Sequence, residues 1–125
     1  MIGRSNVGKS TLMNTMVGSK VAITTPKPQT TRLPIQGILS RPEGQIVFVD
    51  TPGVLKGARD TLSKRLAASV TASLHDVDVV AYIVDPTRDI GDEEKSVLRM
   101  VKGLKAPKIL VINKIDLYKK PFIDF

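Results

Sequence analysis

The sequence predicts a three-layer α/β fold with a mostly parallel sheet. Segments with the periodicity of strands and of helices alternate along the 125 residues, which is the pattern of helices packed on both faces of a parallel sheet. Two of the strand segments, 79–84 and 108–112, are almost continuously apolar, as expected of strands covered on both faces. Polar and glycine-containing segments follow several strands, at the edge of the sheet where ligands of this fold class collect.

The composition indicates one globular domain. Hydrophobic residues make up 42% of the chain and charged residues 25%, and the longest apolar runs are too short to cross a bilayer. The chain has no cysteine, which excludes disulfides and thiolate metal sites. The net charge of +7 would favour a polyanion such as RNA or the ribosome. The basic residues are dispersed without interleaved aromatic residues, so a generic solvated surface explains the charge equally well.

The first half of the chain is predicted to form one helix and a pair of strands. Apolar residues at helical spacing place the helix at 9–17, and Gly18 is placed to cap its C-terminus. The segment 19–34 is polar and contains three prolines, so it is predicted to be a long, mobile loop. The two strands are predicted at 35–39 and 45–49, on either side of a turn that contains proline and glycine.

The second half is predicted to alternate helix and strand. Leucine and valine recur every four residues across 62–74, which predicts one apolar helix face. The strand 79–84 follows, and after it comes a helix that Asp92 can cap, with two glutamates favourably placed in its first turn. The last predicted strand, 108–112, is interpreted as buried.

The segment Gly3–Ser10 fits a phosphate-binding loop. It reads G-R-S-N-V-G-K-S and matches G-x-x-x-x-G-K-[ST], in which backbone amides and a helix N-terminus surround a phosphate chain. Its two glycines avoid Cβ atoms that would obstruct the turn. Lys9 would reach the β- and γ-phosphates, and the Ser10 hydroxyl would complete a Mg²⁺ shell. The predicted nucleotide-binding residues of this segment are Gly3, Arg4, Ser5, Asn6, Val7, Gly8, Lys9, Ser10 and Thr11. A glycine-containing turn before an ordinary helix is the alternative.

A second candidate segment, D-T-P-G at 50–53, follows the predicted strand 45–49. Asp50 could hold Mg²⁺ through water, and Gly53 could offer its backbone N–H to a γ-phosphate. These two contacts suggest a switch that responds to the γ-phosphate. Aspartate, proline and glycine also favour turns, so a turn at the end of the strand is an equally good interpretation of this segment alone.

The segment N-K-I-D at 113–116 predicts selection of guanine. Asp116 can accept hydrogen bonds from guanine N1–H and the exocyclic amine, whereas adenine would leave this carboxylate unpaired. Asn113 would hold O6 or N7 and tie the segment to the phosphate loop, and the aliphatic stem of Lys114 would cover the base. N-K-x-D alone could arise by chance. Three motifs in order, each at the end of its predicted strand, together predict a guanine nucleotide site and conflict with an ATPase.

These motifs, with P-Q-T-T-R at 28–32, resemble the translation-factor-related class of small GTPases. P-K-P-Q-T-T-R followed by I-Q-G-I is more narrowly similar to the Era family, and the resemblance covers essentially all 125 residues. It implies a P-loop NTPase fold, binding of GTP and GDP, and slow intrinsic GTP hydrolysis. Ser5 departs from the proline usual in Era-like loops. GTPases of ribosome assembly with doubled domains, and those of tRNA modification, are the alternative relatives.

The resemblance also implies a switch around the metal. Thr31, in preference to Thr30, would close over Mg²⁺ when a γ-phosphate is present. The implied metal ligands are therefore Ser10, Thr31 and Asp50. Val54 stands where many signalling GTPases carry a glutamine that orients the attacking water, and valine has no donor or acceptor for this purpose. Backbone groups or a partner would then position the water.

One residue of the loop has a second implied role. Asn6 matches an asparagine that, in several relatives, helps to bind a K⁺ ion in place of an arginine finger. Stabilising the turn of the loop is the alternative role for Asn6. The residues implied in catalysis are Lys9, Thr31, Gly53 and Asn6.

The chain is expected to be a GTPase domain, 1–125, that lacks most of its first strand, because only Met1 and Ile2 precede the loop, and that lacks its last strand and helix, which residues 117–125 do not supply. Era-like proteins continue into an RNA-binding KH domain, which is absent from this sequence. The resemblance implies that the parent protein acts in small-subunit assembly, through rRNA and the ribosomal subunit, in the bacterial cytoplasm or an organellar matrix. It leaves peripheral contact with a membrane open. The alternative function is a truncated, inactive guanine-nucleotide-binding fragment.

Overall fold

The computed structural model describes residues 1–18, 35–49, 74 and 76–117. In chain order its elements are α1 (Lys9–Val17), β1 (Ile35–Arg41), β2 (Gly44–Val49), β3 (Val80–Val84), α3 (Asp92–Gly103) and β4 (Lys108–Ile112). These bounds confirm the predicted helix at 9–17 and the predicted strand at 108–112, and the other predicted strands differ from the observed ones only near their ends. The predictions for 19–34, for 50–54 and for the helix at 62–74 apart from Leu74 lie outside the described residues.

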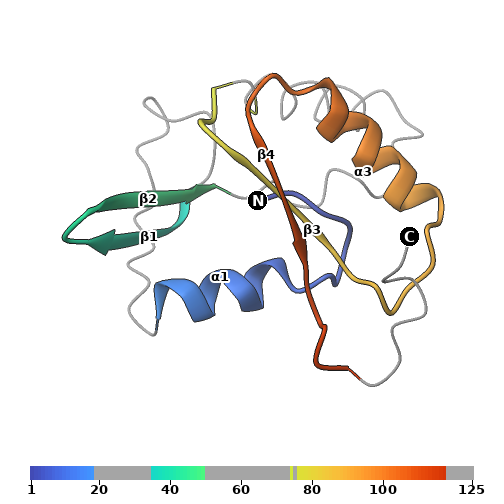
Figure 1. Ribbon diagram of the computed structural model, residues 1–125, viewed down its shortest axis with the longest axis horizontal. Coiled ribbons are helices and arrows are strands. Elements are labelled where there is room, and N and C mark those ends of the chain that lie inside the picture. The colour runs from blue at the N-terminus through green and yellow to red at the C-terminus, as the bar shows by residue number, and fades with distance from the viewer. Residues whose placement is uncertain (19–34, 50–73, 75, 118–125) are drawn as a thin grey trace.

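Two pairs of strands are joined by the first residues of the chain (Figure 1). β1 and β2 pair antiparallel, and β3 and β4 pair parallel from Val80↔Lys108 to Val84↔Ile112. Ile2 forms a parallel bridge to Tyr82, and the Met1 ammonium donates to Val49 O at 2.7 Å. The start of the chain therefore lies between β2 and β3, as a strand that leads into a phosphate loop must.

The core lies between the strands and the helices. Its main cluster consists of buried apolar residues from the chain start, from position 74, from β3 and from the α3 region, namely Ile2, Leu74, Val80, Tyr82, Val97, Val101 and Leu104. α1 packs against the hairpin instead, and a Cβ added at Gly37 would meet Val17 Cγ2 at 3.2 Å. Figure 1 shows α1 and α3 on either side of β3 and β4. No helix among the described residues is long and apolar enough to cross a membrane.

The start of α3 differs from the prediction. Gly91, and not Asp92, is the N-cap, and no side chain caps the helix. Gly91 is extended and its carbonyl accepts the N–H of Lys95 at 3.1 Å, so the chain enters the helix one residue earlier than predicted. Asp92 instead lies in the first turn with two glutamates, where negative charge is favoured by the helix dipole.

The prediction that the strand at 108–112 is buried was wrong. Ile109 is 56% exposed, Leu110 58% and Ile112 42%. Among the described strands β4 pairs only with β3, so it forms an edge of the sheet that this part of the chain makes. A continuous apolar run predicts that a strand can be covered on both faces, but it does not supply the elements that cover it.

Candidate nucleotide-binding site

The loop that precedes α1 requires glycine at two positions. A Cβ at Gly3 would lie 2.5 Å from Ile83 O, and a Cβ at Gly8 would lie 2.3 Å from the Asn113 Nδ2. Gly8 also has a φ of +94° and is the N-cap of α1, which has no side-chain cap. The loop therefore passes close to the ends of β3 and β4 and leads into a helix N-terminus that no side chain caps, a favourable arrangement for an anion.

Three consecutive carbonyls of the loop are held by side chains from elsewhere in the chain. The contacts are Arg88 Nη1 to Ser5 O at 2.9 Å, Lys114 Nζ to Asn6 O at 2.8 Å, and Asn113 Nδ2 to Val7 O at 2.8 Å. The described peptide bonds are all trans, so each carbonyl points opposite to the N–H of the following residue. The amide of each of residues 6–8 therefore points away from the donor on the preceding carbonyl, and successive amides left in this way can form an anion-binding nest.

Lys9 folds back across the start of the loop. Its Nζ donates to Gly3 O and to Arg4 O, each at 2.8 Å. Because the lysine stem leaves from the first residue of α1, the amine lies over the loop rather than pointing along the helix. The predicted role of Lys9 at the β- and γ-phosphates requires an amine in this region.

The segment after β4 is anchored by a buried carboxylate. Asp85 is 4% exposed and accepts from Lys114 Nζ at 2.7 Å, from Thr87 N at 2.9 Å and from Thr87 Oγ1 at 2.6 Å. Burial alone would raise the pKa of Asp85, but these hydrogen bonds outweigh it and hold that pKa below its ordinary value. Lys114, with a φ of +58°, is thus fixed between Asp85 and the loop, whereas Asp116 is exposed.

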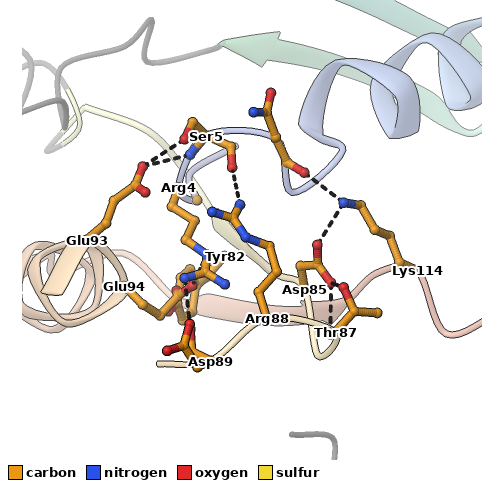
Figure 2. Close-up of polar contacts among 12 residues, drawn as sticks. Arg4, Ser5, Tyr82, Asp85, Thr87, Arg88, Asp89, Glu93, Glu94 and Lys114 are labelled. Atoms are coloured by element: carbon orange, nitrogen blue, oxygen red, sulfur yellow. Dashed lines mark hydrogen bonds and ion pairs between the residues drawn. The ribbon is translucent and has the colours of Figure 1, made fainter. Parts of the chain in front are cut away.

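Arg4 belongs to a different environment from the one its place in the motif suggests. Arg4 is 3% exposed, and its side chain donates to Asp89 O at 2.9 Å and forms an ion pair with Glu94 at 3.1 Å. Glu94 also accepts from the buried Tyr82 hydroxyl, and burial together with this contact raises the pKa of Tyr82 well above its usual value. Figure 2 shows Arg4 pointing from the loop toward Glu94 and Asp89, so only its backbone remains for a phosphate.

Sequence reasoning found the loop and the 113–116 segment but missed the polar residues that support them. These are Asp85, Arg88, Glu93 and Glu94, which come from the segment after β3 and from the first turn of α3. For Asp85 and Arg88 the signal was the same as for the motifs, since charged residues shortly after a buried strand share an edge of the sheet with the loop. The two glutamates of α3 carried no such signal.

The predicted metal ligands are only partly described. Ser10 is exposed at the start of α1, while Asp50 and Thr31, like Thr30 and Gly53, lie outside the described residues. Within the part of the chain that the structure describes, no three histidine, cysteine or acidic residues gather as a metal site would require. A magnesium site here would depend on the Ser10 hydroxyl, phosphate oxygens and water.

The model of the 50S ribosome-binding GTPase family matches residues 1–114. The chain belongs to this family. The match confirms the predicted fold class, a P-loop GTPase domain. The predicted resemblance to the Era family is confirmed by the relatives described below.

Two relatives are GTPase Era of Halothermothrix orenii and of Caldanaerobacter subterraneus subsp. tengcongensis. The first is 47% identical over 123 residues, which are 98% of this chain and 42% of the relative. The second is 50% identical over 117 residues, which are 94% of this chain and 39% of the relative. The chain thus spans about two fifths of the length of these curated relatives.

Two solved structures of Era share the fold. The structure of Era in complex with MgGDPNP and a 16S ribosomal RNA fragment matches with a TM-score of 0.71 and 37% identity, covering 98% of this chain and 43% of that one. An Era variant of Aquifex aeolicus bound to GDP and AlF₄⁻ matches with a TM-score of 0.68 and 38% identity, covering 91% of this chain and 39% of that one.

Proposed function

We propose that this GTPase-family chain binds GDP and GTP with Mg²⁺ and hydrolyses GTP slowly, as the nucleotide-binding part of an Era-like switch. The observation that carries the proposal is the contact between the two predicted binding segments. Asn113 and Lys114 donate to consecutive carbonyls of the phosphate loop, so the residues expected at the base and those expected at the phosphates form one site. Hydrolysis by such a site depends on positioning and on electrostatic stabilisation of the transferred phosphoryl group.

The residues of the loop fit a nucleoside di- or triphosphate bound with Mg²⁺. Gly3 and Gly8 leave the space that a Cβ would fill, and the N-terminus of α1 carries no side-chain cap or acidic residue in its first turn. The Ser10 hydroxyl would be the protein ligand of Mg²⁺ from this segment, with Asp50 and Thr31 proposed as the others. When bound, the ion would neutralise charge on the β- and γ-phosphates.

Asn6 is proposed to assist hydrolysis through K⁺. It is exposed and has a φ of +59°, so it stands at the outer bend of the loop. Single-turnover hydrolysis of GTP by the chain is expected to be faster in KCl than in NaCl at equal ionic strength. Equal rates in the two salts would leave Asn6 only the role of stabilising the turn.

The setting of the switch is proposed from its relatives. The solved Era complex contains 16S ribosomal RNA, so we propose that the protein to which this domain corresponds engages small-subunit rRNA and the ribosomal subunit. The net charge of +7 would assist approach to RNA. The relatives named above are bacterial, which favours the bacterial cytoplasm over an organellar matrix.

Ligand-dependent thermal stabilisation tests the proposed function. The melting temperature of the chain would be measured with Mg²⁺ and GDP, GTP or ATP, because a folded site gains about 2.7 kcal/mol at a ligand concentration of 100 times Kd. We expect a rise with GDP and GTP and none with ATP. Equal shifts with ATP would refute guanine selection. No shift with any nucleotide would favour the alternative of an inactive fragment.

A further inference from the structure

Ser5 of the phosphate loop is held from two sides by residues that belong to no motif. Arg88 Nη1 donates to Ser5 O at 2.9 Å. The Ser5 N–H and the Ser5 Oγ both donate to Glu93 Oε1, at 2.9 Å and 3.1 Å. Figure 2 shows Arg88 rising from the segment after β3 and Glu93 reaching across from the start of α3. We refer to Ser5, Arg88 and Glu93 together as the Ser5 clasp.

The clasp fixes the peptide units on both sides of Ser5. On the amino side, the Ser5 N–H faces Glu93, so the Arg4 carbonyl of the same peptide points the other way, where it accepts Lys9 Nζ. On the carboxyl side, the Ser5 carbonyl faces Arg88, so the N–H of residue 6 points away from Arg88. The clasp therefore orients the first amide of the proposed nest and one of the carbonyls that hold the lysine.

Both partners of Ser5 are charged, which strengthens their hydrogen bonds. The Ser5 N–H is the main reason that the pKa of Glu93 lies below its ordinary value; burial acts against it, and the Ser5 hydroxyl, Arg4 and Arg88 act with it. The groups that face Glu93 are thus donors or cations. The carboxylate remains charged at neutral pH, and the contact with the loop persists there.

We propose that Arg88 and Glu93 are positioning residues of the phosphate site, which act through Ser5 to keep the loop in the shape that receives a phosphate chain. The inference rests on the proposed function. Neither side chain needs to contact the nucleotide. If only a fraction of the molecules hold the loop in the shape that binds a phosphate chain, the apparent dissociation constant for the nucleotide equals the intrinsic constant divided by that fraction. Loss of one charged and half-buried hydrogen bond is expected to reduce the competent fraction about tenfold.

The test compares two variants of the clasp with two matched controls in the full 125-residue chain. Arg88→Ala and Glu93→Gln are expected to bind GDP with Mg²⁺ about tenfold more weakly by isothermal titration. The controls Arg99→Ala and Asp92→Asn change the same charges on exposed positions of α3, and they are expected to bind as the wild type does. Arg88→Lys keeps a cationic donor and should recover part of the affinity.

Hydrogen exchange without nucleotide separates positioning from general stability. Amides of residues 4–8 are expected to exchange faster in Arg88→Ala and Glu93→Gln, while those of β3 keep the wild-type rate. Faster exchange throughout β3 would show a merely structural role and overturn the proposal. So would unchanged GDP affinity, or an equal loss of affinity in the controls. A wild type that binds no guanine nucleotide would instead refute the proposed function on which the inference rests.

Discussion

Replacing Asp85 by asparagine removes one charge from the buried pair that joins the segment after β3 to the segment after β4. The Asp85 carboxylate accepts from Lys114 Nζ at 2.7 Å and from two groups of Thr87. Asparagine has nearly the same shape, so Asp85→Asn tests the charge and the hydrogen bonds with little change in packing. The asparagine amide has one acceptor oxygen, whereas the donors of Lys114 and Thr87 share the two carboxylate oxygens of Asp85 in the wild type.

The size of the effect follows from burial. The side chain of Asp85 is fully buried, while that of Lys114 is 32% exposed. Breaking a fully buried ion pair costs about 3–5 kcal/mol, and a hydrogen bond to a charged group contributes about 1.5–3 kcal/mol. Because water reaches Lys114, we expect Asp85→Asn to lower the free energy of unfolding by about 2 kcal/mol, which is below the range for a fully buried pair and within the range for a hydrogen bond to a charged group.

The assay is urea unfolding followed by circular dichroism, together with titration of GDP. Lys114 would retain only its contact with the loop carbonyl, so the affinity for GDP is expected to fall about tenfold. Asp78→Asn, at an exposed position before β3, is the matched control and should change the unfolding free energy by less than about 0.5 kcal/mol. An Asp85→Asn chain as stable as the control would show that the pair does not stabilise the fold.

Three further predictions concern the loop, the base and pH. Gly8→Ala is expected to weaken GDP binding by about 1–3 kcal/mol, because the new Cβ would have to fit at a φ of +94°. A Cβ at Gly44 would meet nothing within 4 Å, so Gly44→Ala should bind GDP normally by titration. Asp116→Ala should lose the preference for GDP over ADP in competition binding, since it removes the acceptor for guanine; a retained preference would contradict the predicted base selection. The pKa values of Asp85 and Glu93 are lowered in the folded chain. Their contribution to stability is therefore present above a pH of about 4 and is lost as the pH falls through the lower pKa values of the folded state. Urea unfolding from pH 7 to pH 3 would detect this loss of stability, and Asp85→Asn should lose less stability over the same range.

The sequence was sufficient to predict what depends on local pattern. The helix at 9–17 and the strand at 108–112 have the observed bounds, because apolar periodicity and glycine at a helix end are local signals. The glycines at 3 and 8 were expected to admit close contacts, and the structure places Ile83 O and Asn113 there. The motif spacing likewise predicted that the phosphate loop and the segment after β4 share an edge of the sheet.

The remaining features depend on contacts between distant parts of the chain. Arg4 was predicted only as a nucleotide-binding residue of the loop; its side chain pairs with the buried Glu94, 90 residues later, and no local pattern reveals such a pairing. The N-cap of α3 is Gly91 and not the predicted Asp92. Glycine and aspartate are both favoured at N-cap positions, so their neighbouring places in the sequence do not decide between them. The Ser5 clasp was missed for the same reason, since Glu93 is 88 residues from Ser5.

The exposure of β4 bears on how molecules of this chain meet in solution. Three of its apolar side chains are between 42% and 58% exposed, and no described strand covers its outer edge, so two copies could join edge to edge. Each copy carries a net charge of +7, and the resulting repulsion extends over a screening length of about 8 Å at physiological ionic strength. Added sulfate shortens the screening length and strengthens the burial of apolar side chains between copies. The chain is therefore expected to disperse at low salt and to self-associate at high salt, the reverse of an assembly held together by charge.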